Sequence, residues 1–118
     1  MIQTYEDLEV YQKSYRLSVE VYQLSKQMPK EETYGVISQL RRAALSIPLN
    51  IAEGYGKRES TAEFKRFLSM AKGSCDEMKV LADFCRDVQY MTEATHDRLK
   101  SGYDEIGKML YSLMRNWR

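Results

Sequence analysis

The chain contains one motif with the spacing of a metal-binding pair, Glu93-Ala94-Thr95-His96. In di-metal four-helix bundles, two such Glu-x-x-His motifs and further carboxylates hold the ions together. This sequence has a single histidine, so it cannot supply a second motif. We therefore predict no metal site, and we expect Glu93 and His96 to lie in the solvated first turn of the last helix.

Signatures of other chemistries are missing from the sequence. It contains no Gly-x-Ser-x-Gly elbow, no P-loop and no Cys-x-x-Cys pair. Cys75 and Cys85 are ten residues apart on one predicted helix, a separation of about 15 Å along its axis that prevents a disulfide bond between them. We predict buried thiols, no cofactor and no enzymatic activity.

A cationic turn, Gly54-Tyr55-Gly56-Lys57-Arg58-Glu59, precedes the segment Ser60-Thr61-Ala62-Glu63. The second segment matches a capping box, in which the serine accepts from the amide of Glu63 and the glutamate carboxylate bonds back to the serine amide. Lys57 and Arg58 then lie beside the free amides of a helix N-terminus, where a phosphate or an RNA backbone group can bind. The alternative interpretation is a capped, soluble turn without a ligand.

Basic residues recur every seven positions from this turn into the following helix. The series is Arg58, Lys65, Lys72, Lys79 and Arg86. It could follow a phosphate backbone, or it could form an ordinary salt-bridged surface with Asp76 and Asp83. Residues 41 to 72 carry seven basic and three acidic residues, a net charge of +4. The cations before Asp76 are expected to escape neutralisation, and Arg41 and Arg42 add to them if the polar side of the second helix faces the same way. The candidate nucleic-acid contacts are therefore Arg41, Arg42, Lys57, Arg58, Lys65, Arg66 and Lys72.

The segment from Tyr34 to Glu53 or Tyr55 has the pattern of a helix with two apolar sides. One stripe, with the spacing of a seam buried inside a bundle, comprises Ile37, Leu40, Ala44, Ile47 and Ile51. The second side comprises Leu45, Pro48, Leu49 and Ala52. Two apolar sides need two neighbours, so this helix is either central in the monomer or in contact with another subunit.

A polar band lies between these two sides and comprises Gln39, Arg42, Ser46, Asn50 and Glu53. It could be a hydrogen-bonded network or the solvated face of the helix. Pro48 lacks a backbone donor and leaves the carbonyl of Ala44 without its helical partner. We therefore predict a kink at Pro48, and we interpret Ser46, Pro48, Asn50 and Glu53 as a structural ladder or a subunit contact.

Three further helices are predicted from apolar periodicity and capping residues. They span about residues 5 or 7 to 28, 60 to 89 and 92 to 117. Gly54 and Gly56 are expected to adopt left-handed conformations at the end of the second helix, and Gly73 to mark a close helix contact. Short connections between long helices predict an all-α, antiparallel up-down-up-down four-helix bundle, with residues 1–118 forming a single domain.

Composition limits the partners and the location. The net charge of +1 gives no general attraction to a polyanion. No apolar run approaches the roughly 20 residues needed to cross a bilayer and no secretory signal is present, so we expect a cytoplasmic protein without a membrane partner. The nine tyrosines fall mostly on packing stripes, which favours core and interface positions over base stacking.

A family resemblance begins at the segment Q-L-R-R-A-A, residues 39–44, followed by S-I-P-x-N-I-A-E-G at residues 46–54. Together they resemble the four-helix-bundle proteins encoded within intervening sequences of bacterial 23S rRNA genes. Tyr11 stands in place of that family's usual tryptophan, and Cys75 in place of a common aliphatic residue. The resemblance implies a ring-like homopentamer with no established catalytic residues. The accessory proteins of diversity-generating retroelements, which bind nucleic acid and a reverse transcriptase, are similar in fold.

Two functions follow from these observations. We expect a non-enzymatic homo-oligomer whose basic rim binds structured RNA or another nucleic acid. The alternative is a protein adaptor or scaffold that binds a protein partner and no nucleic acid. A contiguous basic surface after assembly would favour the first function, and an exposed apolar groove would favour the second.

Overall fold

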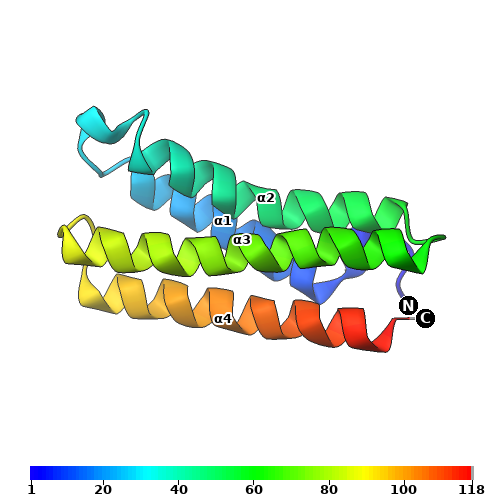
Figure 1. Ribbon diagram of the computed structural model, residues 1–118. Coiled ribbons are helices and arrows are strands. Elements are labelled where there is room, and N and C mark those ends of the chain that lie inside the picture. Colours follow the sequence, from blue (N-terminus) through cyan, green and yellow to red (C-terminus); the bar gives the residue numbers. More distant parts are fainter. Residues whose placement is uncertain (118) are drawn as a thin grey trace.

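The computed structural model describes residues 1–117, which form four antiparallel α-helices in an elongated bundle of 44 × 23 × 22 Å (Figure 1). The helices are α1 (Glu9–Ser25), α2 (Val36–Gly56), α3 (Thr61–Asp87) and α4 (Glu93–Asn116), and short 3₁₀ turns occur at Tyr5–Asp7 and Lys30–Glu32. The two ends of the chain lie at the same end of the bundle, as an up-down-up-down order requires. The predicted all-α four-helix bundle is confirmed.

Three of the helical segments have an N-cap residue whose side chain accepts a hydrogen bond from a backbone amide. Thr4 forms a reciprocal capping box with Asp7 at the first 3₁₀ turn, Ser60 accepts from the amide of Glu63 at α3, and Thr92 accepts from the amide of Thr95 at α4. At α3 the predicted box is only half formed, because the Glu63 carboxylate bonds to a nearby arginine instead of the Ser60 amide. The helix starts at Thr61 and Glu93 therefore follow from local sequence.

The predicted first helix is too long at both ends. Leu8 has an extended backbone, with φ −76° and ψ 124°, and separates the 3₁₀ turn from α1. Its side chain is buried in the core, so packing of this one residue outweighs the continuation of the helix. At the other end, α1 stops at Ser25, before the turn that leads to Pro29.

The core forms along the predicted seams of the helices. All five residues of the α2 stripe are buried, together with Phe64, Leu68 and Met78 of α3 and Leu99 and Ile106 of α4. Both cysteines are free and buried, as predicted. Burial raises the pKa of Cys75 to about 12 and that of Cys85 to about 11, so neither thiol is a nucleophile at neutral pH.

The backbone conformations and contacts of the glycines differ from the prediction. No glycine in residues 1–117 has a positive φ, and α2 continues through Gly54 to Gly56. Gly54 is instead a close-packing position, because a Cβ there would lie 2.7 Å from Cβ of Phe67 on α3. Gly73, the predicted contact, has no neighbouring atom within 4 Å of its Cβ position. The left-handed residue is Gln89, with φ 67°, in the turn between α3 and α4.

The second apolar side of α2 is only partly covered within the chain. Leu45 and Leu49 keep 46% and 59% of their surface exposed, although Pro48 between them is buried. Next to them on α1, the side chains of Tyr15, Val19 and Tyr22 are also exposed. α2 packs against both α1 and α3 within the monomer, yet Leu45 and Leu49 stay exposed, so part of its second apolar side remains available to another subunit.

The hydroxyl of Tyr103 is a polar group inside the apolar core, and its effect on stability can be measured. Its side chain is 1% exposed, and within residues 1–117 its hydroxyl has no hydrogen-bond partner. A buried, unpaired hydroxyl lowers stability, so Tyr103→Phe is expected to raise the free energy of unfolding by about 1 kcal/mol. Tyr90→Phe is the matched control, because the Tyr90 hydroxyl donates to Glu32 over 2.8 Å and its loss should lower stability. Chemical denaturation of both variants checks the prediction, which fails if Tyr103→Phe is the less stable of the two.

Candidate nucleic-acid interface

Two predicted contact residues, Lys57 and Arg58, lie in the turn between α2 and α3, and aromatic rings hold both side chains. The Arg58 guanidinium lies 4.0 Å from the ring centre of Tyr55 and donates to the Tyr55 carbonyl over 2.9 Å. The Lys57 ammonium lies 5.6 Å from the ring centre of Phe67. Such cation–π contacts restrict long side chains while leaving the charge accessible.

Arg66 also contacts the aromatic ring of Phe67. Its guanidinium carbon lies 4.6 Å from the ring centre of Phe67, so Phe67 lies between two cations. Arg66 also forms two hydrogen bonds of 3.1 Å with Glu63, which lower the pKa of that carboxyl. The expectation that Arg66 escapes neutralisation is therefore wrong. Because this ion pair uses two of its donors, Arg66 has fewer left for a phosphate.

Lys72 lies on the side of α3 that faces α4, and Lys65 precedes it by seven residues on the same helix. Lys72 lines a hollow of about 220 Å³ between these helices, together with Lys108 and Tyr111 of α4. Farther along, Lys79 pairs with Asp76 and with Asp104 of α4, at 3.4 and 3.3 Å. The basic series is thus accessible near the start of α3 and neutralised beyond Lys72, as the salt-bridge interpretation predicts for its later members.

Arg41 and Arg42 do not join this cluster. Arg41 faces α1, where its Nε donates to Ser25 over 2.8 Å and its guanidinium stacks 4.2 Å above the ring of Tyr22. Arg42 is exposed on α2, and at about 1.5 Å per residue it lies roughly 20 Å before the end of that helix. Lys57, Arg58, Lys65 and Arg66 therefore lie at one end of the bundle, and Lys72 lies about 16 Å from the start of α3.

The polar band of α2 is only partly a network. Ser46 Oγ lies 2.8 Å from the carbonyl of Ala43 and 2.7 Å from Oγ of Ser74, so it links α2 to α3. The Asn50 amide donates to the carbonyl of Ser46 over 2.8 Å. Glu53 is exposed, as Arg42 is. The middle of the band is thus structural, and its two ends face solvent.

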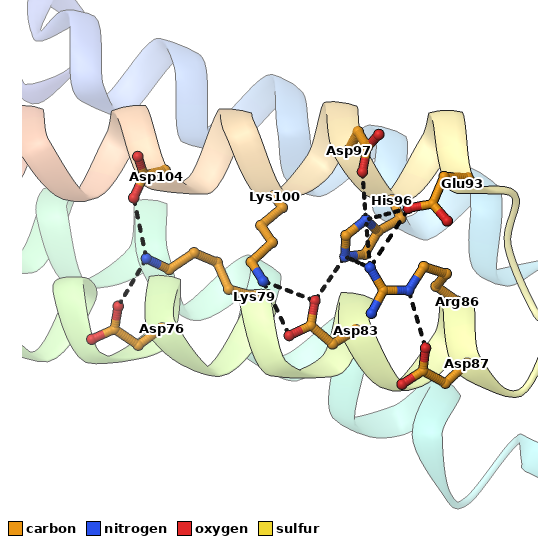
Figure 2. Close-up of polar contacts among 10 residues, drawn as sticks. All are labelled: Asp76, Lys79, Asp83, Arg86, Asp87, Glu93, His96, Asp97, Lys100 and Asp104. Carbon is orange, nitrogen blue, oxygen red and sulfur yellow. Dashed lines mark hydrogen bonds and ion pairs between the residues drawn. The ribbon is translucent and has the colours of Figure 1, made fainter.

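His96 is buried rather than solvated, which corrects the sequence prediction. Its side chain is 4% exposed and lies between α3 and α4 (Figure 2). Nε2 lies 2.7 Å from Oδ1 of Asp83, and Nδ1 lies 2.8 Å from Oδ1 of Asp97. The sequence held a signal for this burial, because His96 continues the apolar stripe of α4 by one step of three residues before Leu99.

The two carboxylates determine the charge of His96. Only an imidazolium ion can donate from both ring nitrogens at once. The hydrogen bond to Asp83, followed by that to Asp97, raises the pKa of His96. In return, hydrogen bonds from His96 and Lys100 lower the pKa of Asp83 to about 2. The side chains thus form an ion network between the two helices.

A metal ion would not fit this network as it stands. Potential ligand atoms of Glu93, His96 and Asp97 lie within 4.8 Å of one another. However, the Arg86 guanidinium lies 3.2 and 3.4 Å from the two ring nitrogens and 3.6 Å from Glu93. That cation would repel a metal, and a metal also requires a neutral imidazole. We therefore interpret these side chains as structural.

Comparison with known proteins places this bundle in a family. The sequence profile of the 23S rRNA-intervening sequence protein family matches residues 6–112. The chain belongs to that family. No curated protein matches this member of the 23S rRNA-intervening sequence proteins.

A solved structure agrees with this family assignment. The chain is similar to a protein of unknown function from the S23 ribosomal protein family of Bacteroides thetaiotaomicron, with 25% sequence identity and a TM-score of 0.82. The match covers 91% of this chain and 99% of the other. In residues 1–117, none of the helices of this 23S rRNA-intervening sequence protein is both long and apolar enough to cross a bilayer.

Proposed function

We propose that this protein is a non-enzymatic, ring-like homo-oligomer that binds the backbone of RNA or DNA through the end of the bundle where α2 meets α3. Membership in the 23S rRNA-intervening sequence protein family supports the proposal, because the name of the family connects it with sequences that interrupt 23S rRNA. The residues are Lys57, Arg58, Lys65, Arg66 and Lys72. Phosphate contacts of this kind position a nucleic acid without reading its sequence.

The observation that carries the proposal is the arrangement of Lys57 and Arg58. Both are exposed at the N-terminal end of α3, and neither forms an ion pair within residues 1–117. Their contacts with Tyr55 and Phe67 already restrict the side chains. Less conformational entropy is then lost when a phosphate binds.

Assembly into a ring would bring several copies of the basic turn together. A single chain has a net charge of +1, which attracts a polyanion weakly. A ring of five, the number that the family resemblance suggests, would carry five such turns around one axis. Binding would then release many counterions, and the affinity would fall steeply as salt rises.

We further propose that Pro48 bends α2 and that the Ser46–Asn50 contacts stabilise the bend. Proline removes the donor for the Ala44 carbonyl and crowds it with its ring. Ser46 and Asn50 bond to the carbonyls of Ala43 and Ser46, close to that position. The bend would set the angle at which the exposed Leu45 and Leu49 meet a neighbouring subunit.

Charge reversal at the turn tests nucleic-acid binding. Lys57→Glu with Arg58→Glu is expected to weaken binding to RNA and DNA of unrelated sequence about tenfold or more at low salt, and by a similar factor for each. Fluorescence anisotropy at two salt concentrations measures the effect. The assembled mass should not change, because exposed charges contribute little to stability.

The matched control reverses two exposed cations elsewhere, Arg16→Glu with Lys30→Glu. It changes the net charge equally but leaves the turn intact, so binding should fall much less. Equal losses in both double variants would show a general charge effect without a site. If the wild type binds no nucleic acid at low salt, the adaptor function is favoured, since the exposed apolar side of α1 and α2 suits a protein contact.

A further inference from the structure

Two separate apolar surfaces remain uncovered on this chain. The first, which we call the α1/α2 face, comprises Tyr15, Val19 and Tyr22 of α1 with Leu45 and Leu49 of α2, all between 44% and 59% exposed. All of these residues except Leu49 line a hollow of about 310 Å³, whose wall also includes Ser18 and Arg41. An engineered apolar cavity of about 150 Å³ holds a benzene molecule, so this hollow has room for an aromatic side chain.

The edge of the α1/α2 face is basic. The Arg41 guanidinium and the Lys26 ammonium lie 4.2 and 5.2 Å from the ring centre of Tyr22. Arg42 is exposed on α2, one turn before Leu45 and two turns before Leu49. A surface that docks here should therefore be apolar at its centre and acidic at its margin.

The second surface, the α3 stripe, has that composition. Val80, Phe84 and Val88 follow one another at intervals of four residues, and they are 66%, 47% and 41% exposed. Exposed acidic residues flank them on the same helix: these are Glu77 and Asp87, of which Asp87 also pairs with Arg86 over 3.0 Å. Phe84 is the aromatic side chain of the stripe, so it is the natural group to enter a hollow.

We propose that the α3 stripe of one copy docks on the α1/α2 face of the next copy, with Phe84 in the hollow beside Tyr15, Val19 and Tyr22. The inference rests on the oligomer in the proposed function and specifies its subunit contact. The two surfaces are different, so each copy keeps one of each available for a further neighbour. Such a head-to-tail contact generates a closed ring when its rotation closes, whereas a two-fold contact would stop at a dimer.

Complementation between two variants tests this contact. Val19→Asp disables the α1/α2 face and Phe84→Asp disables the α3 stripe, so each variant alone is expected to be a monomer. When the two are mixed, one intact surface remains on each chain, and one heterodimer should form without larger species. Light scattering at micromolar protein, after circular dichroism has confirmed native helix content, measures the masses. Tyr34→Asp, at a residue 97% exposed outside both surfaces, should keep the wild-type mass.

Several results would overturn the contact. These are wild-type mass for both variants, a Phe84→Asp protein that still forms a dimer, and monomers that do not pair when mixed. If Val19→Asp or Phe84→Asp unfolds, Tyr15→Glu and Val80→Glu replace them in the same scheme. A monomeric wild type would overturn the proposed assembly together with this contact, whereas an oligomer that both variants leave intact overturns the contact alone.

Discussion

Gly54→Ala is expected to lower the free energy of unfolding by about 1–2 kcal/mol, although alanine is the better helix former. In an open helical position the change should gain about 0.5–1 kcal/mol. At Gly54 the new methyl group would lie 2.7 Å from Cβ of Phe67 and 3.3 Å from Cδ1 of Phe64. A Cβ atom cannot rotate away, so α2 and α3 must separate, and overpacking of this kind costs about 1–3 kcal/mol.

Gly73→Ala is the matched control for this experiment. Gly73 lies inside α3, and an added Cβ would meet no atom within 4 Å. This variant should therefore be more stable than the wild type by about 0.5–1 kcal/mol. Denaturant unfolding of both variants gives the comparison. Equal stabilisation by the two substitutions would show that the α2–α3 contact at Gly54 is not tight.

The second large effect is a dependence of stability on pH through His96. Its pKa is raised in the folded protein, so its contribution is complete below the unfolded value of about 6.5 and is lost as pH rises through the folded value. The effect of Asp83 on stability depends on pH in the opposite direction, because its pKa is lowered to about 2. Its contribution to stability is present above about pH 4 and is lost as pH falls toward 2. The network is therefore strongest between about pH 4 and 6.5.

His96→Gln is expected to lower the free energy of unfolding at pH 6 by about 1 kcal/mol, because the charged hydrogen bonds to Asp83 and Asp97 are lost. Between pH 6 and 9 the wild type should lose stability and this variant should not. Because the chain has one histidine, a single imidazole NMR signal reports the pKa directly. Thermal unfolding across this pH range measures the stability.

Asp104→Asn serves as the control for the pH experiment. It removes an ion pair with Lys79 between the same two helices and does not contact His96 (Figure 2). Its pH profile should parallel that of the wild type. A His96 pKa at or below 6.5, or the same profile in His96→Gln, would show that His96 does not hold a charge in this network.

Part of the candidate site could be predicted from local sequence. Lys57, Arg58 and Ser60 are neighbours in the chain, and the Ser60 cap involves an amide three residues away. The pairing of Lys79 with Asp76 on the same helix follows from helical spacing. Arg41 was expected to join this surface if the polar side of the second helix faced it, but its contact with Ser25 of α1 separates it from that surface.

The sequence by itself determined the number of helices, the capped starts of α3 and α4 and the buried stripes, because these depend on residues within one or two turns of each other. Only the tertiary structure decided that Gly54 meets Phe67, that His96 lies between Asp83 and Asp97, and that Leu45 and Leu49 stay exposed. These features depend on which helix becomes the neighbour and on its register. A shift of α3 by one turn would preserve every local pattern, yet it would remove Phe67 from Gly54 and Asp83 from His96.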